Sequence, residues 1–386
     1  MLYLYIHYKK SNGYVKYLRI IFLLAAYHLI FSLFYHSYIL THGGDSLGFW
    51  ELSISNYRTA ERWMDYFEYG NFFMQWLNYV PFKILGMSYF AGNLLYGFLG
   101  FLAFAELFRL GYHYWGLSKE WAWENSWVLL LFLPNLHFWT AGVGKETLLW
   151  LGLVLCLRWC SFPQKYWYLA LFGIFLSFMV RPIHGALLVG VFAVWMVFGS
   201  GIASKKYKWV GLGVLLLGSV VSLKVLLRQT HLTELNFSSI LAFFSSQQKF
   251  LEGFGADSYL EMAEMNFLER FWAVLFRPLP WEAVGFWQWA AALENSIFLV
   301  LVITALWFLL IKGKRPKLPA FLYAGLALTV MMMAIYAMTL NNFGIFMRMK
   351  SIFVVFFYFG AWKVIMDKSG KQNSSFSPKG IFVANL

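Results

Sequence analysis

The sequence predicts an all-α membrane protein, a polytopic bundle of about ten transmembrane segments with interfacial amphipathic helices in two long outer loops. Three observations support this fold class. Of the 386 residues, 60% are hydrophobic and only 13% are charged, whereas a soluble domain has about 25% charged residues. The hydrophobic residues form long runs. Many of the basic residues gather in short loops between alternate runs, which is typical of the cytoplasmic loops of membrane proteins.

The apolar runs define the predicted membrane segments, at roughly 20 residues for each crossing. They lie near 19–40, 88–110, 126–141, 147–160, 167–180, 186–202, 208–228, 294–311, 318–340 and 351–366. The run 126–141 contains Pro134 and Asn135, and 147–160 is short. We therefore expect these two to be broken or re-entrant helices. Residues 1–366 then form a single transmembrane domain, and 367–386 form a flexible cytoplasmic tail.

The positive-inside rule orients these segments. When the N-terminus is placed in the cytoplasm, the loops SKKYK (204–208) and KGKRPK (312–317) both lie inside, and both chain termini are cytoplasmic. The two longest loops, about 41–87 and 229–293, then lie outside. Both are rich in aromatic residues, which predicts helices that lie in the membrane interface. In the second loop, Ser258-Tyr-Leu-Glu261 has the pattern of a capping box at a helix start.

The net charge of +13 does not predict a nucleic-acid partner, because inner loops and contact with anionic membrane lipids explain it. Cys156 and Cys160 lie four residues apart in an apolar run, so we expect packed side chains and no metal site. The stretch GVGKE at 142–146 resembles the end of a Walker A loop. However, Trp139 and Glu146 stand where that motif needs Gly and Ser or Thr, so no nucleotide cofactor is predicted.

Polar motifs collect on the predicted outer side. Charged residues near a membrane that escape the inward bias are candidates for a functional site. The motifs are GGDS (43–46), PNLHFWTAGVGKE (134–146), RPIHG (181–185), FRPLPWE (276–282), EN (294–295) and NNFGIFMRMK (341–350). The catalytic candidates are Asp45, as the base, and Glu146, which orients Lys145. The candidate cations for the donor phosphate are Lys145, Arg181, Arg277 and Arg348. The secondary candidates are His184, Glu51, Glu282, Glu294 and Asn342.

A carboxylate among fixed cations suits transfer of a group from a lipid phosphate or diphosphate. The cations bind the donor phosphate and stabilise the charge that develops on the leaving group. The carboxylate accepts the proton of an acceptor hydroxyl. Transfer of this kind outside the cytoplasm needs no nucleotide, and the sequence carries no nucleotide-binding motif.

Each motif also has a structural explanation. GGDS fits a helix C-cap followed by an N-cap, and the Arg-Pro pairs at 181–182 and 277–278 fit helix ends. Lys145 and Glu146 fit an ion pair at a helix start, while Gly142 and Gly144 fit an anion-binding backbone nest before that helix. His184 has no acidic neighbour and fits a hydrogen-bonded structural residue. Glu282 and Glu294 fit ion-pair partners of these arginines. The sequence leaves these alternatives open.

An acidic residue just past the first transmembrane helix, here Asp45, followed by an interfacial segment, resembles the GT-C class of membrane glycosyltransferases. Arginines in outer regions, here Arg181, Arg277 and Arg348, resemble the polymerases and ligases of bacterial surface polysaccharide. This resemblance implies a multi-pass enzyme of the bacterial inner membrane whose active site faces the periplasm. Such an enzyme transfers a sugar or oligosaccharide from a polyprenyl-(di)phosphate-linked donor to a glycan or lipid acceptor. Residue 47 is leucine, so no DxD pair is present and no metal is expected.

Two other functions fit parts of the sequence. A lipid-linked oligosaccharide flippase or transporter would place charges near the centres of several segments, whereas centres such as LVLVITALWFLL (299–310) are apolar. A membrane acyltransferase would place a histidine beside an acid, and neither His137 nor His184 has an adjacent acid. The glycosyltransferase remains the preferred prediction.

Overall fold

The computed structural model describes residues 12–54, 60–118, 123–198, 236–252, 258–262, 264–312 and 316–368, with a few isolated residues between 209 and 227. Within these ranges the secondary structure is helical, apart from one isolated antiparallel bridge between Tyr259 and Asn342. The all-α class is therefore confirmed. Most of the predicted segment 208–228, the loop 204–208 and most of the tail lie outside the described residues.

Five described helices are long and apolar enough to cross a membrane, which indicates a membrane-embedded protein. Two further helices, α8 (Trp167–Val180) and α9 (Pro182–Phe198), are apolar but shorter. Ten full crossings remain a prediction. The five long helices are α2 (Asn12–His42), α5 (Tyr89–Trp115), α13 (Gly285–Lys312), α14 (Ala320–Thr339) and α15 (Phe343–Lys368).

The segment predicted at 126–141 is broken at Pro134, as the sequence predicts. The 3-10 helix η3 (Trp123–Phe132) ends there and α6 (Pro134–Thr140) begins, with Leu133 in extended conformation between them. Proline is tolerated at the start of a helix and not in its interior, because it has no N–H to donate. The following α7 (Lys145–Ser161) has only 17 residues. The loop that joins α6 to α7, residues 141–144, is buried.

Within the described residues, the first long loop forms four short helical pieces, and the second contains two longer helices and one short turn. That these helices lie in the membrane interface stays a prediction. The prediction of a capping box at Ser258 is wrong. The helix start lies at Asn266, whose side chain accepts hydrogen bonds from the N–H groups of Leu268 and Glu269, because the apolar helical pattern begins only after Asn266. The elements are α3 (Asp45–Trp50), η1 (Trp63–Tyr66), α4 (Asn71–Tyr79), η2 (Val80–Ile84), α11 (Phe237–Glu252), α12 (Phe267–Phe276) and η4 (Pro280–Glu282).

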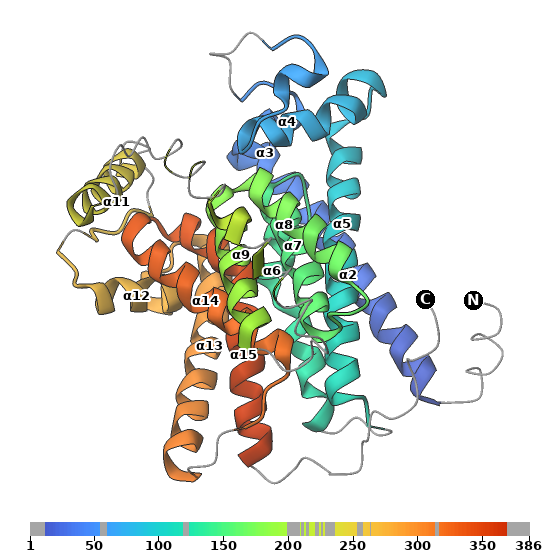
Figure 1. The fold of residues 1–386 in the computed structure, drawn as a ribbon, viewed down its shortest axis with the longest axis vertical. Helices are drawn as coiled ribbons and strands as arrows, with labels where there is room; N and C mark the ends of the chain where they lie inside the picture. The colour runs from blue at the N-terminus through green and yellow to red at the C-terminus, as the bar shows by residue number, and fades with distance from the viewer. Residues whose placement is uncertain are drawn as a thin grey trace.

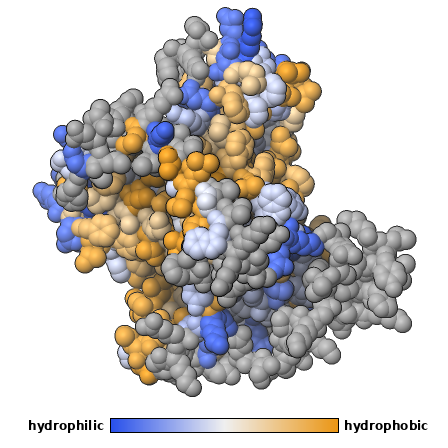
Figure 2. Space-filling model, viewed as in Figure 1, coloured by the Kyte–Doolittle hydropathy of each residue, from blue (hydrophilic) through white to orange (hydrophobic). Residues whose placement is uncertain are grey.

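The helices pack around α7 and α15 (Figure 1). α7 contacts α5, α8 and α14, while α15 packs against α13 and α14. The peripheral helices α2 and α13 expose large apolar side chains, and Figure 2 shows hydrophobic residues over the flank that α13 forms. An exposed surface of this kind is stable in lipid and unfavourable in water.

Basic residues mark the end of the bundle where α2 begins and α5 and α7 end. Lys16 Nζ donates a hydrogen bond to the carbonyl oxygen of Ser118 at 3.1 Å. Glu106 forms ion pairs with Arg109 and Arg158. The candidate residue Asp45 follows the end of α2, and Lys145 begins α7, so both lie at the other end of these helices from the basic residues. The helix directions thus separate these basic residues from the candidate site, as the predicted topology requires.

Candidate functional site

Five of the six principal candidate residues come together at one end of the bundle. We call Asp45, Lys145, Glu146, Arg181 and Arg348 the charged cluster. Glu146 Oε1 lies 2.7 Å from Arg181 Nη2 and 3.0 Å from Arg348 Nε. Asp45 Oδ2 lies 3.6 Å from Arg348 Nη1. The cluster therefore joins the starts of α3 and α7, the junction between α8 and α9, and the first turns of α15.

Glu146 holds the two arginines of the cluster. Its side chain is only 2% exposed, and one carboxylate oxygen contacts both guanidinium groups. Burial raises the pKa of Glu146, but Arg348 and Arg181 lower it more strongly, so the pKa lies below its ordinary value. Glu146 thus stays charged and positions Arg181 and Arg348.

Lys145 is oriented by a residue other than the one predicted. Its Nζ donates a hydrogen bond to Asn71 Oδ1 at 2.7 Å and lies 5.5 Å from the centre of the Phe49 ring. The prediction that Glu146 orients Lys145 is wrong in this respect, because the Glu146 carboxylate faces the arginines. Burial, together with the neighbouring Arg181 and Arg348, lowers the pKa of Lys145 to about 7, although Glu146 and Asp45 act in the opposite direction.

Asp45 is the accessible carboxylate of the cluster, with 57% of its side chain exposed. It begins α3 directly after Gly43 and Gly44, whose φ angles are 76° and 130°, a region that favours glycine. The expected helix end at Gly43 is present, since its N–H bonds to the carbonyl oxygen of Ile39 at 2.9 Å. The expected cap by Asp45 or Ser46 is absent: the N-cap is Gly44, with no side-chain cap bond. The Asp45 carboxylate therefore faces Arg348.

The α6–α7 loop carries the start of α7 to this place. A Cβ on Gly142 would lie 2.1 Å from the Tyr35 ring, so only glycine allows α2 to approach so closely. The N–H of Val143 donates to Asn93 Oδ1 at 2.9 Å. This N–H is therefore not free to bind an anion, and the anion-binding nest at Gly142–Gly144 stays a prediction.

Arg348 also lies against an aromatic ring. Its guanidinium carbon is 5.8 Å from the centre of the Trp139 ring, and 23% of its side chain is exposed. Arg181 additionally contacts the Met349 sulfur. With Lys145, the cluster holds three cations against two carboxylates, which leaves one positive charge uncompensated. An anion such as a phosphate group complements this excess.

Arg277, the remaining principal candidate, makes different contacts. It forms an ion pair with Glu282, and its guanidinium carbon lies 5.2 Å from the Phe343 ring centre. Its carbonyl oxygen accepts a hydrogen bond from Lys350 Nζ at 3.1 Å. The structure thus places Arg277 and Glu282 together as a pair and does not bring either into contact with the charged cluster among the described interactions. The grouping of Arg277 with the other cations is corrected accordingly.

Two of the secondary candidates, Glu294 and Asn342, accept hydrogen bonds from backbone N–H groups. Glu294 Oε2 accepts a hydrogen bond from the N–H of Asn135 at 2.9 Å, which fixes the start of α6. Asn342 Oδ1 accepts from the N–H of Ile345 at 3.2 Å and so supports the start of α15. Glu51 is exposed at the end of α3. None of these contacts reaches a residue of the charged cluster.

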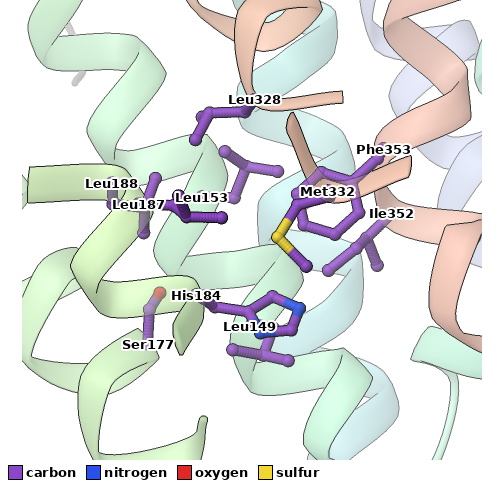
Figure 3. A pocket seen from close by; sticks show the side chains of 10 residues that line it. All are labelled: Leu149, Leu153, Ser177, His184, Leu187, Leu188, Leu328, Met332, Ile352 and Phe353. Carbon is purple, nitrogen blue, oxygen red and sulfur yellow. The ribbon is translucent and has the colours of Figure 1, made fainter. Parts of the chain in front are cut away.

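His184 lies behind the cluster in the helix packing. Its Nε2 is 2.9 Å from the Tyr336 hydroxyl, and it is only 4% exposed. Figure 3 shows His184 and Ser177 at a small cavity of about 10 Å³ that is otherwise lined by apolar side chains. This placement agrees with the structural interpretation of His184, because the enclosed cavity has no room for a sugar or a lipid phosphate.

Sequence reasoning missed the residues that hold the cluster in place. Asn71 and Asn93 accept hydrogen bonds from Lys145 and Val143, and Trp139 lies beside Arg348. Trp139 lies inside the motif PNLHFWTAGVGKE (134–146), where its aromatic neighbours indicate an aromatic cluster. The two asparagines carry no local pattern, because each bonds a partner distant in the chain.

Comparisons with protein-family models, with curated proteins and with solved structures each give no match. Among the described residues, no group of three or more His, Cys, Asp or Glu side chains is placed to hold a metal ion. The function is therefore argued from the charged cluster itself.

Proposed function

We propose that this protein is a membrane glycosyltransferase that moves a sugar or oligosaccharide from a polyprenyl-(di)phosphate-linked donor to a glycan or lipid acceptor. The observation that carries the proposal is the convergence of an accessible carboxylate, Asp45, and a cation triad, Lys145, Arg181 and Arg348, at one end of an apolar helix bundle. This end is where a lipid substrate presents its phosphate, because headgroups lie at the membrane surface.

The cations bind the donor phosphate. Arg348 and Arg181 are held by Glu146 on one side. Each guanidinium has five N–H groups, and those that Glu146, Asp45 and Met349 do not engage would donate to phosphate oxygens. Lys145 adds a third donor from the start of α7. When the bond between the sugar and the phosphate oxygen breaks, negative charge develops on the leaving phosphate. Fixed cations stabilise this charge without reorganisation.

Asp45 acts as the base. The acceptor hydroxyl attacks the sugar carbon, its proton passes to the Asp45 carboxylate, and the bond between sugar and phosphate breaks. The products are the new glycosidic bond, the lipid (di)phosphate and protonated Asp45, which returns its proton to solvent. Glu146 is unsuited to this role because it is buried between two arginines, whereas more than half of the Asp45 side chain is exposed.

The cellular setting extends the same proposal. The basic loops predicted at 204–208 and 312–317 support a cytoplasmic location for that side of the protein and for both termini. The charged cluster then faces the periplasm of a bacterial inner membrane, where surface polysaccharide is assembled. Membrane lipids surround the bundle, and polymerisation of polysaccharide repeats is one reaction of this class.

The test uses cells that lack the native gene and express one variant at a time. Membranes from these cells are supplied with lipid-linked sugars extracted from the cells that lack the gene. Asp45→Asn should lower the initial rate of sugar transfer roughly 10²–10⁴-fold, the usual contribution of a general base. Glu51→Gln is the matched control, because Glu51 is an exposed carboxylate on the same segment, and its rate should stay within about threefold of the unmodified protein. An Asp45→Asn protein that inserts normally and keeps its full rate would refute the assignment.

A further inference from the structure

Four aromatic residues pack against one another beside the charged cluster. We call Tyr38, Phe138, Trp139 and Trp287 the aromatic strip; they come from α2, α6 and α13. The ring centre of Phe138 lies 5.0 Å from that of Trp139, 5.2 Å from that of Tyr38 and 5.4 Å from that of Trp287. The ring centres of Tyr38 and Trp287 are 5.3 Å apart. The strip therefore links the two peripheral helices across α6.

The aromatic strip begins at the cation site. Trp139 is the ring that lies 5.8 Å from the Arg348 guanidinium, and Arg348 contacts both Asp45 and Glu146. A ligand with its phosphate at Arg348 thus reaches Trp139 first and the rest of the strip next. A lipid phosphate has this order of parts: a charged head joined directly to an apolar chain.

The far side of the strip opens onto lipid-facing surface. α2 and α13 are the two least buried of the five long helices, and Figure 1 shows them running apart from this region toward the opposite end of the molecule. Both present exposed apolar side chains. Phe34 is 50% exposed on α2, while Leu293 and Ile297 are 56% and 64% exposed on α13. A hydrocarbon chain that leaves the strip would remain in contact with apolar groups.

The geometry of the rings favours a hydrocarbon over a sugar. Sugars stack on open ring faces, but the Tyr38–Phe138 and Phe138–Trp139 pairs are edge-to-face, at 84° and 90°, and Phe138 is only 8% exposed. In each such pair the edge of one ring lies against the face of the other, and the Arg348 guanidinium lies over the Trp139 ring, which leaves less open ring face for a sugar. What the strip presents is apolar surface, which contacts branched aliphatic groups well.

We propose that the aromatic strip binds the isoprenoid units next to the phosphate of the lipid donor. This inference rests on the proposed function, since it assumes that a lipid phosphate occupies the cation site. It adds the residues that bind the polyprenyl chain and the path by which the donor enters, between α2 and α13. Trp287 is then a specificity residue for the lipid part of the donor.

The experiment measures binding of a series of phosphate monoesters to the full-length protein in nanodiscs. The probes are methyl, dimethylallyl, geranyl and farnesyl phosphate, whose apolar chains lengthen stepwise. Affinity should rise along the series. Trp287→Ala should weaken farnesyl phosphate binding about tenfold and leave methyl phosphate unchanged. Trp307→Ala is the matched control, because Trp307 lies on the same helix and is 63% exposed, but farther along it; its affinities should be those of the unmodified protein.

Two different results separate the two proposals. If neither methyl nor farnesyl phosphate binds the unmodified protein, or if Arg348→Lys leaves both affinities unchanged, the phosphate site and the proposed function fail. If methyl phosphate binds but a longer chain adds no affinity, or if Trp287→Ala and Trp307→Ala behave alike, the aromatic strip is not the isoprenoid site. The phosphate site would stand in that second case.

Discussion

The Oδ2 atom of Asp45 lies 3.6 Å from Nη1 of Arg348, which brings the start of α3 into contact with the first turns of the final helix. The same arginine contacts the buried Glu146 through its Nε at 3.0 Å. Arg348 therefore has an exposed and a buried carboxylate on its two edges. This arrangement fixes the guanidinium plane and leaves Asp45 accessible, which suits an arginine that binds a phosphate beside a catalytic base.

The first prediction concerns the shape of Arg348. Arg348→Lys keeps the positive charge but has a single nitrogen in place of the planar guanidinium, whose Nη1 and Nε contact Asp45 and Glu146 separately. We expect the rate of sugar transfer to fall roughly 10²-fold, as when a single transition-state donor is lost. Arg277→Lys is the control. Since Arg277 pairs with Glu282, its transfer rate should change less than about threefold, and equal losses in both variants would contradict the separate roles.

The second prediction concerns the buried carboxylate. Glu146→Gln removes the partner of Arg181 and Arg348 in a site where the carboxylate is 2% exposed. Loss of one partner of a buried ion pair costs about 3–5 kcal/mol, because the remaining charge is left uncompensated. We expect a lower midpoint of thermal unfolding in detergent, together with loss of transfer.

A double-mutant cycle separates this effect from general damage. Arg181→Gln should cost much less stability in the Glu146→Gln background than in the unmodified protein, because the two side chains act as a pair. Strictly additive losses would show that the 2.7 Å contact between them contributes nothing measurable.

The third prediction concerns pH. Burial and the neighbouring Arg181 and Arg348 lower the pKa of Lys145 to about 7, so the free protein loses this positive charge as pH rises through that value. A phosphodiester donor keeps its own charge over the same range and must be met by a protonated lysine. Donor affinity should therefore be highest below about pH 7 and fall by up to roughly tenfold per pH unit above it. Lys145→Met should bind weakly and show no such fall; an unchanged pH profile in this variant would assign the titration to another group.

The fourth prediction concerns the buried loop before α7. Gly142→Ala places a Cβ 2.1 Å from the Tyr35 ring, whereas the nearest atom to a Cβ on Gly144, the Tyr35 hydroxyl, is 3.5 Å away. Gly142→Ala should displace the loop and lower both the unfolding midpoint and the transfer rate, since overpacking costs about 1–3 kcal/mol. Gly144→Ala has ordinary contacts and an extended φ of −170°, so it should have nearly the stability of the unmodified protein. A stable, active Gly142→Ala protein would contradict the packing of α2 on this loop.

Several features of the fold could be predicted from local patterns. The break at Pro134 follows from the missing N–H of proline, and the end of α2 at Gly43 follows from the preference of glycine for positive φ. The capping box at Ser258 was mispredicted because the same short pattern recurs at Asn266, where the apolar helix begins. A four-residue pattern does not decide between two such places.

The sequence predicted which residues form the site better than it predicted the contacts between them. The grouping of Asp45 with Arg348 followed from assigning both to the same end of the helices, since the direction of each segment depends on how many precede it. The sequence did not indicate the partner of Lys145, and it left both Glu282 and Glu294 as candidate partners of the arginines. Asn71 and Glu282 are selected by the rotation of α4 and by the turn after α12, and no residue spacing encodes these.

The sequence alone determined that this chain is a helical, apolar bundle with charged residues at the helix ends, because hydrophobicity, proline and glycine act over a few neighbouring residues. The tertiary structure decided which charges meet. Ion pairs form over a few ångströms and depend on how each helix is rotated and packed. Only the folded protein therefore separates Arg348, beside Asp45 and Glu146, from Arg277, beside Glu282.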